Sequence, residues 1–139
     1  MTIKIGVTAT QKGATEAQLA TFERLLRSNL RPAELHHGDC IGGDEQAHNL
    51  AFPLGIRTVA HPPTNGKARA YCLADYSLKP RPYLDRNKDI VNAVDVLLAM
   101  PRLDQEERRS GTWSTVRYAR QVKKPIGIIW PNGNVTLEF

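Results

Sequence analysis

The stretch Val94-Asp95-Val96-Leu97-Leu98-Ala99-Met100-Pro101 decides the fold. It is apolar apart from Asp95, it is short, and a proline ends it, which is typical of a β-strand buried on both faces of a sheet. The charged loop 102–109 separates it from a predicted helix running from Trp113 to Lys124, and a second apolar run, 126–130, follows that helix. The unit of strand, helix and strand predicts two parallel strands joined by the helix.

The residues Ser110-Gly111-Thr112, at the start of this helix, are a candidate anion-binding site. The first N–H groups of a helix lack partners within the helix and carry a partial positive charge, so they can hold a phosphate. Gly111 would let a ligand approach the backbone, and the hydroxyls of Ser110 and Thr112 add two donors. The same residues would equally serve as an N-cap and a turn, so both interpretations stay open.

The 139-residue chain is long enough for one domain, which we expect to span residues 1–139. No apolar run has the length of a membrane span, and the N-terminus lacks a signal-peptide pattern, so we expect a cytoplasmic protein without a membrane partner. Cys40 and Cys72 are too few for a disulfide scaffold and wrongly spaced for zinc. The net charge of +5 favours anionic partners. Nucleic acid is possible but not favoured, because the basic segments lack interleaved aromatic residues.

Strands and helices alternate along the rest of the chain. Predicted strands cover 3–8, 34–38, 56–60, 94–100 and 126–130, and predicted helices begin at Thr15, Asp44, Tyr83 and Trp113. The first helix is predicted to end near Asn29 to Pro32. We expect 64–82 to be a mobile loop with one helical turn around Ala68 to Asp75, and Val135 to Phe139 to pair as an edge strand.

This alternation predicts an α/β fold, namely a Rossmann-like doubly wound parallel sheet of about five strands in the order 3-2-1-4-5, with helices on both faces. Ligands of such sheets bind outside the carboxyl ends of the strands, where strands one and four are neighbours. The loops 8–13, 38–44, 64–82 and 100–112 meet at this edge. Every motif that suggests a site lies in one of these loops or at the head of the helix that follows, and Thr8 stands at the end of the first strand.

Gly42 and Gly43 follow the second strand and would let the backbone approach a ligand. Their surroundings match neither a G-x-G-x-x-G fingerprint nor a P-loop, so a standard dinucleotide or ATP site is not predicted. Asp39 and Asp44 flank the two glycines. Either carboxylate could bind ribose hydroxyls or act as a base, while the alternatives are a turn former and a helix N-cap.

Arg86 and Asn87, near the start of the helix that begins at Tyr83, could reach a phosphate, with the arginine as a bidentate donor. The alternative is a solvent-exposed helix face. The four histidines share no helical face and no recognised ligand spacing, so we predict neither a metal nor a resident cofactor; they are His36, His37, His48 and His61.

Three segments together resemble one group of proteins. The stretch His37-Gly38-Asp39-Cys40-Ile41-Gly42-Gly43-Asp44-Glu45-Gln46-Ala47 resembles the glycine-rich second loop of the SLOG superfamily of Rossmann-like proteins. Asp85 to Ile90, followed by Ala93 to Pro101, is similar to its arginine-bearing helix and fourth strand. Ser110-Gly111-Thr112, followed by Lys123 to Ile126, is similar to its Gly-Thr helix and fifth strand. The resemblance covers most of the chain in the right order.

The superfamily includes cytokinin-activating phosphoribohydrolases, DNA-processing proteins that bind single strands, molybdenum-cofactor carriers and sensors of nucleotide-derived signals. Its members share a pocket for a nucleotide-like ligand, and related proteins often dimerise through helices beside the sheet. The resemblance therefore implies a nucleotide-like partner and a possible homodimer. It also implies ligand-binding roles for five residues, namely Gly42, Gly43, Arg86, Gly111 and Thr112.

One departure from the superfamily bears on catalysis. The phosphoribohydrolases have a Gly-Gly-x-Gly-Thr-x-Glu-Glu pattern whose acidic residues assist cleavage of the N-glycosidic bond, but here Trp113-Ser114-Thr115 follows Thr112. Losing one such electrostatic contact typically costs a few kcal/mol of transition-state stabilisation. The first hypothesis is therefore a binding protein, a sensor or a carrier of a phosphate-bearing ligand. The alternatives are a nucleotide N-glycosidase that uses Asp39 or Asp44, a molybdenum-cofactor carrier, and a nucleic-acid binder.

Overall fold

Two parallel strands at the centre of the sheet, β1 (Lys4–Ala9) and β5 (Val96–Met100), position the rest of the molecule. Ile5 pairs with Val96 and Ala9 pairs with Met100, so both strands end at the same edge. Along β5, Leu98 packs into the hydrophobic cluster on one face of the sheet, and Leu97 packs into the cluster on the other. This alternation is the physical basis of the uninterrupted apolar run in the sequence.

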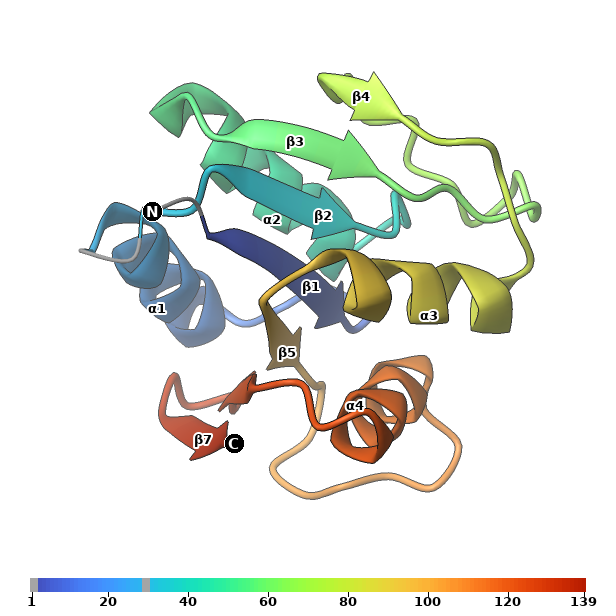
Figure 1. The fold of residues 1–139 in the computed structure, drawn as a ribbon. Helices are drawn as coiled ribbons and strands as arrows, with labels where there is room; N and C mark the ends of the chain where they lie inside the picture. Colours follow the sequence, from blue (N-terminus) through green and yellow to red (C-terminus); the bar gives the residue numbers. More distant parts are fainter. Residues whose placement is uncertain (1–2, 29–30) are drawn as a thin grey trace.

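The computed structural model describes residues 3–28 and 31–139, and Figure 1 shows their arrangement. Within these residues, one sheet contains seven strands in the order β4-β3-β2-β1-β5-β6-β7. The other strands are β2 (Glu34–His37), β3 (Arg57–Ala60), β4 (Tyr76–Ser77), β6 (Ile126–Ile129) and β7 (Val135–Glu138). The helices are α1 (Glu16–Arg27), α2 (Gly43–Ala51), α3 (Tyr83–Ala93) and α4 (Gly111–Gln121), with a 3-10 turn, η1 (Phe52–Leu54), after α2.

The predicted Rossmann-like topology is confirmed. The strands β3-β2-β1-β5-β6 are all parallel, and their order along the sheet is the predicted 3-2-1-4-5. Two short strands extend this sheet at its edges: β4 runs parallel to β3, and β7 runs antiparallel to β6. The strand β7 is the edge strand expected over 135–139. The switch point lies between β1 and β5, whose connections leave in opposite directions.

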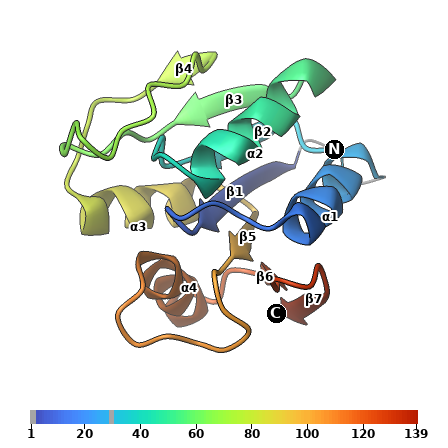
Figure 2. The ribbon, with the colours of Figure 1, turned by 180° about the vertical axis from the view of Figure 1, so that it is seen from behind.

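The helices form two layers. Figures 1 and 2 show α1 and α2 on one face of the sheet and α3 and α4 on the other. Phe22 and Ala47 pack with Val7 on the first face, whereas Val91 and Trp113 belong to the cluster on the second. Since both faces are covered, the carboxyl edge of the sheet is where its central strands become accessible to a ligand.

The segment 64–82 differs from the expected mobile loop. None of residues 68–75 is helical, and Tyr76–Ser77 forms β4 instead. Buried or half-buried contacts anchor it: the Asp39 carboxylate accepts the N–H of Cys72 at 2.8 Å, and the Asp75 carboxylate accepts the N–H of Thr58 at 2.9 Å. These contacts join residues far apart in the sequence, and no local pattern could reveal them.

Several helix boundaries also differ from the predicted ones. The helix α4 begins at Gly111 rather than Trp113, because the Ser110 side chain caps it by accepting the N–H of Trp113, and it ends at Gln121. The helix α1 ends at Arg27, and within the predicted end, 29–32, residues 29 and 30 lie outside the described residues. Among the helices of the described chain, none has the length and apolar character needed to cross a lipid bilayer.

Gln18 connects α1 to the edge of the sheet. Its side-chain amide is fully buried and donates to the carbonyls of Pro101 and Ile129 at 2.7 and 2.9 Å, while its amide oxygen accepts the N–H of Thr15 at 2.9 Å. Thr15 returns the interaction by accepting the N–H of Gln18, which completes a capping box. The start of α1 is thereby fixed against the ends of β5 and β6.

Candidate functional site

A cavity of about 530 Å³ opens at the carboxyl ends of β1 and β5, where the topology predicts a ligand. Its floor is the end of β1 and the loop after it, residues 7–11. The loop after β2 and the first turn of α2 form one side, and the loop before α4 forms the other. The first turns of α3 complete the wall. The cavity therefore draws on the segments that the sequence placed together, with one exception: none of the segment 64–82 lines it.

The N-terminus of α4 presents unused donors to this cavity. Within the described chain, the N–H groups of Gly111 and Thr112 have no hydrogen-bond partner. Ser110 accepts the N–H of Trp113 at 3.3 Å, which leaves its hydroxyl hydrogen free to donate. A Cβ built on Gly111 would meet no atom within 4 Å, so the backbone there faces open space. This is the arrangement that holds anions at helix N-termini.

Arg109, directly before the cap, also lines the cavity. Among the described residues it forms neither an ion pair nor a hydrogen bond, whereas Arg102, on the same wall, is paired with Glu107 at 2.8 Å. Sequence reasoning treated Arg109 only as part of a charged loop and missed it. The available signal was its position, one residue before a Ser-Gly-Thr helix start.

Asp44 lines the opposite side of the cavity from the first turn of α2. Its carboxylate is buried and accepts backbone N–H groups from Cys40, at 3.4 Å, and from Gly38. Burial raises the pKa of the Asp44 carboxyl to about 6, and the positive charge of Arg86 opposes this rise. At neutral pH the cavity therefore holds a carboxylate that carries its charge with little water around it.

Arg86 is buried and ties three elements together. Its guanidinium donates to the carbonyl of Gly38 and, at 3.1 Å, to the carbonyl of His61, so it joins the ends of β2 and β3 to α3. Its Nε donates to the side-chain oxygen of Asn87 at 2.8 Å, which leaves the two amide hydrogens of Asn87 as donors. Both residues line the cavity.

Three predicted site residues lie behind the cavity wall, outside its lining. The N–H of Gly43 is occupied by the carbonyl of Thr10 at 2.9 Å, and Gly42 adopts a φ of +99° with its Cα packed against Gln11. Asp39 is fully buried, and its carboxylate binds the Arg69 guanidinium at 2.9 Å in addition to the N–H of Cys72. These contacts hold the loop after β2 in place. Thr8, Asp44, Arg86, Asn87, Ser110, Gly111 and Thr112 do line the cavity.

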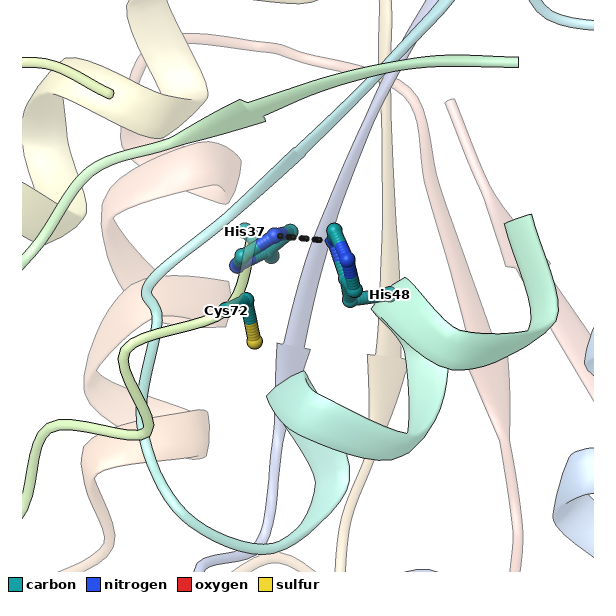
Figure 3. A group of neighbouring side chains, drawn as sticks. All are labelled: His37, His48 and Cys72. Carbon is teal, nitrogen blue, oxygen red and sulfur yellow. Dashed lines mark hydrogen bonds between the residues drawn. The ribbon is translucent and has the colours of Figure 1, made fainter. Parts of the chain in front are cut away.

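A cluster that the sequence spacing did not reveal lies on the α2 face of β2. His37 Nε2 lies 3.3 Å from His48 Nδ1, and one possible ligand atom from each of His37, His48 and Cys72 lies within 4.8 Å of the other two. Figure 3 shows the three side chains, with the contact between the two histidines dashed. A metal would need the lone pair of His37 Nε2, and the ring proton would then sit on Nδ1. However, His37 Nδ1 accepts the N–H of Asp39 at 3.0 Å, so Nε2 carries the proton and donates it to His48. Burial lowers the pKa of His37 to about 3, consistent with a neutral, hydrogen-bonded pair.

Comparison with known proteins finds solved structures with a similar fold. No protein-family model and no curated protein sequence matches the chain. Its structure is similar to that of the molybdenum cofactor binding protein from the phototrophic bacterium Rippkaea orientalis, with a TM-score of 0.74 and 22% identity over 94% of this chain and 77% of that one. It is also similar to the Moco carrier protein from Chlamydomonas reinhardtii, with a TM-score of 0.65 and 21% identity over 92% of this chain and 76% of the other.

A third similar structure is that of DNA processing protein A from Streptococcus pneumoniae, with a TM-score of 0.69 and 18% identity. The match covers 91% of this chain but only 50% of that protein. Identities this low establish a shared fold with these proteins without establishing a shared ligand. The chain therefore shares its Rossmann-like fold with these proteins.

Proposed function

We propose that the cavity binds a small phosphate-bearing ligand, a nucleotide or a nucleotide-derived molecule, and that the protein acts as its sensor or carrier. One observation carries this proposal: the N–H groups of Gly111 and Thr112 and the guanidinium of Arg109, all without a partner among residues 3–28 and 31–139, border the same cavity. A phosphate there would receive backbone hydrogen bonds and a charge-assisted bond while neutralising the positive end of the α4 dipole.

The structural neighbours support a carrier role at a coarse level. Two of them bind or carry the molybdenum cofactor, which is itself a phosphate-bearing pterin. The cavity volume of about 530 Å³ lies within the range of small-molecule and cofactor sites. A carrier of that cofactor is therefore the specific alternative within the same proposal, because it would use the same phosphate contacts.

Isothermal titration calorimetry with AMP, GMP and inorganic pyrophosphate tests the proposal. Arg109→Ala should weaken binding about 10- to 100-fold, since a hydrogen bond to a charged group contributes about 1.5–3 kcal/mol. Arg108→Ala is the matched control, because Arg108 is the adjacent arginine and does not line the cavity. Its affinity should stay within about twofold of the wild type, as expected for a surface charge.

Two results would contradict the proposal: no measurable binding of any of the three probes, or equal affinities for the Arg109 and Arg108 variants. Chromatography of the titrated mixtures adds a further readout. Release of free base from AMP or GMP would assign the alternative N-glycosidase function, with Asp44 as the candidate carboxylate in the cavity lining, since Glu107 is paired with Arg102.

A further inference from the structure

The two sides of the cavity differ in electrostatic character. The α4 side offers N–H groups and Arg109, which has no ion pair in the described part of the chain, whereas the α2 side offers the carboxylate of Asp44. The other carboxylate in the lining, that of Glu107, is neutralised by Arg102 at 2.8 Å. Within the described chain, Asp44 has no ion-pair partner, because the nearby Arg86 directs its N–H groups to the carbonyls of Gly38 and His61 and to Asn87.

Asp44 keeps unused acceptor capacity. A carboxylate can accept about four hydrogen bonds, and Asp44 receives backbone N–H groups from Cys40 and Gly38, the former at a long 3.4 Å. A buried carboxylate without further partners is unfavourable, so a ligand that brings two N–H donors would compensate for the missing water. A ligand that brings an acceptor to the same place would be repelled.

The neighbouring residues suit a flat ring. Tyr83 also lines the cavity, and the Arg86 guanidinium lies 5.3 Å from the centre of its ring, so the wall includes an aromatic ring beside Arg86. Asn87 adds amide hydrogens there, because its oxygen already accepts from Arg86. A wall that combines a carboxylate, an amide donor and an aromatic ring is complementary to a heterocycle that carries both donors and an acceptor on one edge.

We propose that Asp44 selects ligands with adjacent N–H donors on a planar ring, the 2-amino-4-oxopyrimidine edge that guanine and pterins share, while the phosphate lies at the α4 N-terminus. This inference rests on the proposed function and names the ligand class of that site. The ring N–H and the exocyclic amino group donate to the carboxylate of Asp44, and the ring carbonyl accepts from the amide of Asn87.

Calorimetry of the wild-type protein with GMP, IMP and AMP, at a pH well above 6 where Asp44 is ionised, tests the inference. GMP and IMP differ only in the exocyclic amino group, so GMP should bind at least about tenfold more tightly than IMP. AMP should bind more weakly still, because its ring N1 is an acceptor. Asp44→Asn should remove most of the preference for GMP, and Asp85→Asn, an exposed aspartate at the start of α3, should retain it.

Equal affinities of the wild type for GMP and IMP would overturn the inference, and so would a full preference for GMP in the Asp44 variant. If that variant does not fold, the comparison of the nucleotides on the wild type decides alone. Binding of all three nucleotides that depends on Arg109 without discriminating among them would reject this inference and leave the proposed function intact. Absence of any binding would reject both.

Discussion

Acid should destabilise this protein through His37, and the size of the effect follows from its burial. The folded protein holds the pKa of His37 at about 3, against 6.5 for the free side chain, chiefly because burial disfavours the charged ring. A lowered histidine pKa means that the unfolded chain binds the proton first. The contribution of neutral His37 to the free energy of unfolding is therefore complete above pH 6.5 and is lost as the pH falls toward 3.

Each pKa unit corresponds to about 1.4 kcal/mol, so the full window is worth about 5 kcal/mol, a large share of a typical unfolding free energy of about 5–15 kcal/mol. His61, whose pKa is lowered to about 4, acts in the same direction. Asp44 acts in the opposite direction, because its pKa is raised from 3.8 to about 6 and protonation relieves its buried charge. The contribution of Asp44 is smaller, at about 3 kcal/mol, so the two histidines decide that acid lowers the free energy of unfolding.

The perturbation is His37→Asn, which removes the titrating ring and keeps an acceptor for the N–H of Asp39. Urea unfolding followed by circular dichroism, repeated at several pH values from about 7 to 4, measures the slope of stability against pH. The variant should be less stable at neutral pH but should lose about 3 kcal/mol less than the wild type over this range. Equal slopes for the two proteins would refute the assignment of the acid sensitivity to His37.

Two further predictions concern residues that position the site. Gln18→Met should lower the free energy of unfolding by about 2–4 kcal/mol in urea at every pH, because it leaves the carbonyls of Pro101 and Ile129 without their donor. A loss of stability that depends on pH would contradict this account. Gly43→Ala should lower the midpoint of thermal unfolding measurably, because its new Cβ would lie 2.3 Å from the Cβ of Ala9. Gly111→Ala is the comparison variant: its Cβ would meet open space, so it should change the free energy of unfolding by less than about 0.5 kcal/mol. Similar midpoints for the two variants would contradict the expected clash between α2 and β1.

The fold was predictable because the sequence patterns that determine it lie within short stretches of the chain. The alternation of apolar strands with helices of regular period restricts an α/β chain to few topologies, since crossovers are right-handed and connections are short. The stretch ending at Pro101 shows this most clearly: its side chains alternate between two buried layers, and only an apolar run satisfies both. The strand β4 was not predictable, because two residues have no periodicity and Asp75 holds them through contacts with Thr58.

The candidate site was predictable only in part, because some of its residues are placed by local structure and others by contacts between distant parts of the sequence. Ser110, Gly111 and Thr112 line the cavity because a helix start carries its free donors wherever it is placed. Asp39 resembled a ligand-binding carboxylate until its long-range partners, Arg69 and Cys72, were known. In the charged run, only its position directly before the Ser-Gly-Thr helix start sets Arg109 apart from Arg108, and the structure shows that Arg109 is the one that lines the cavity. The ligand contacts and the homodimer stay predictions.

The amide of Gln18 has a consequence for how the protein unfolds. Its two acceptors lie 83 and 111 residues further along the chain, so one side chain from the first helix closes against the ends of two strands formed much later in the sequence. Neither terminal half of the chain can form both hydrogen bonds of the Gln18 amide alone. We therefore expect the backbone amides of α1 and β6 to exchange their hydrogens at the same slow rate, that of global unfolding. Synthesis must therefore have passed Ile129 before the first helix acquires its full protection.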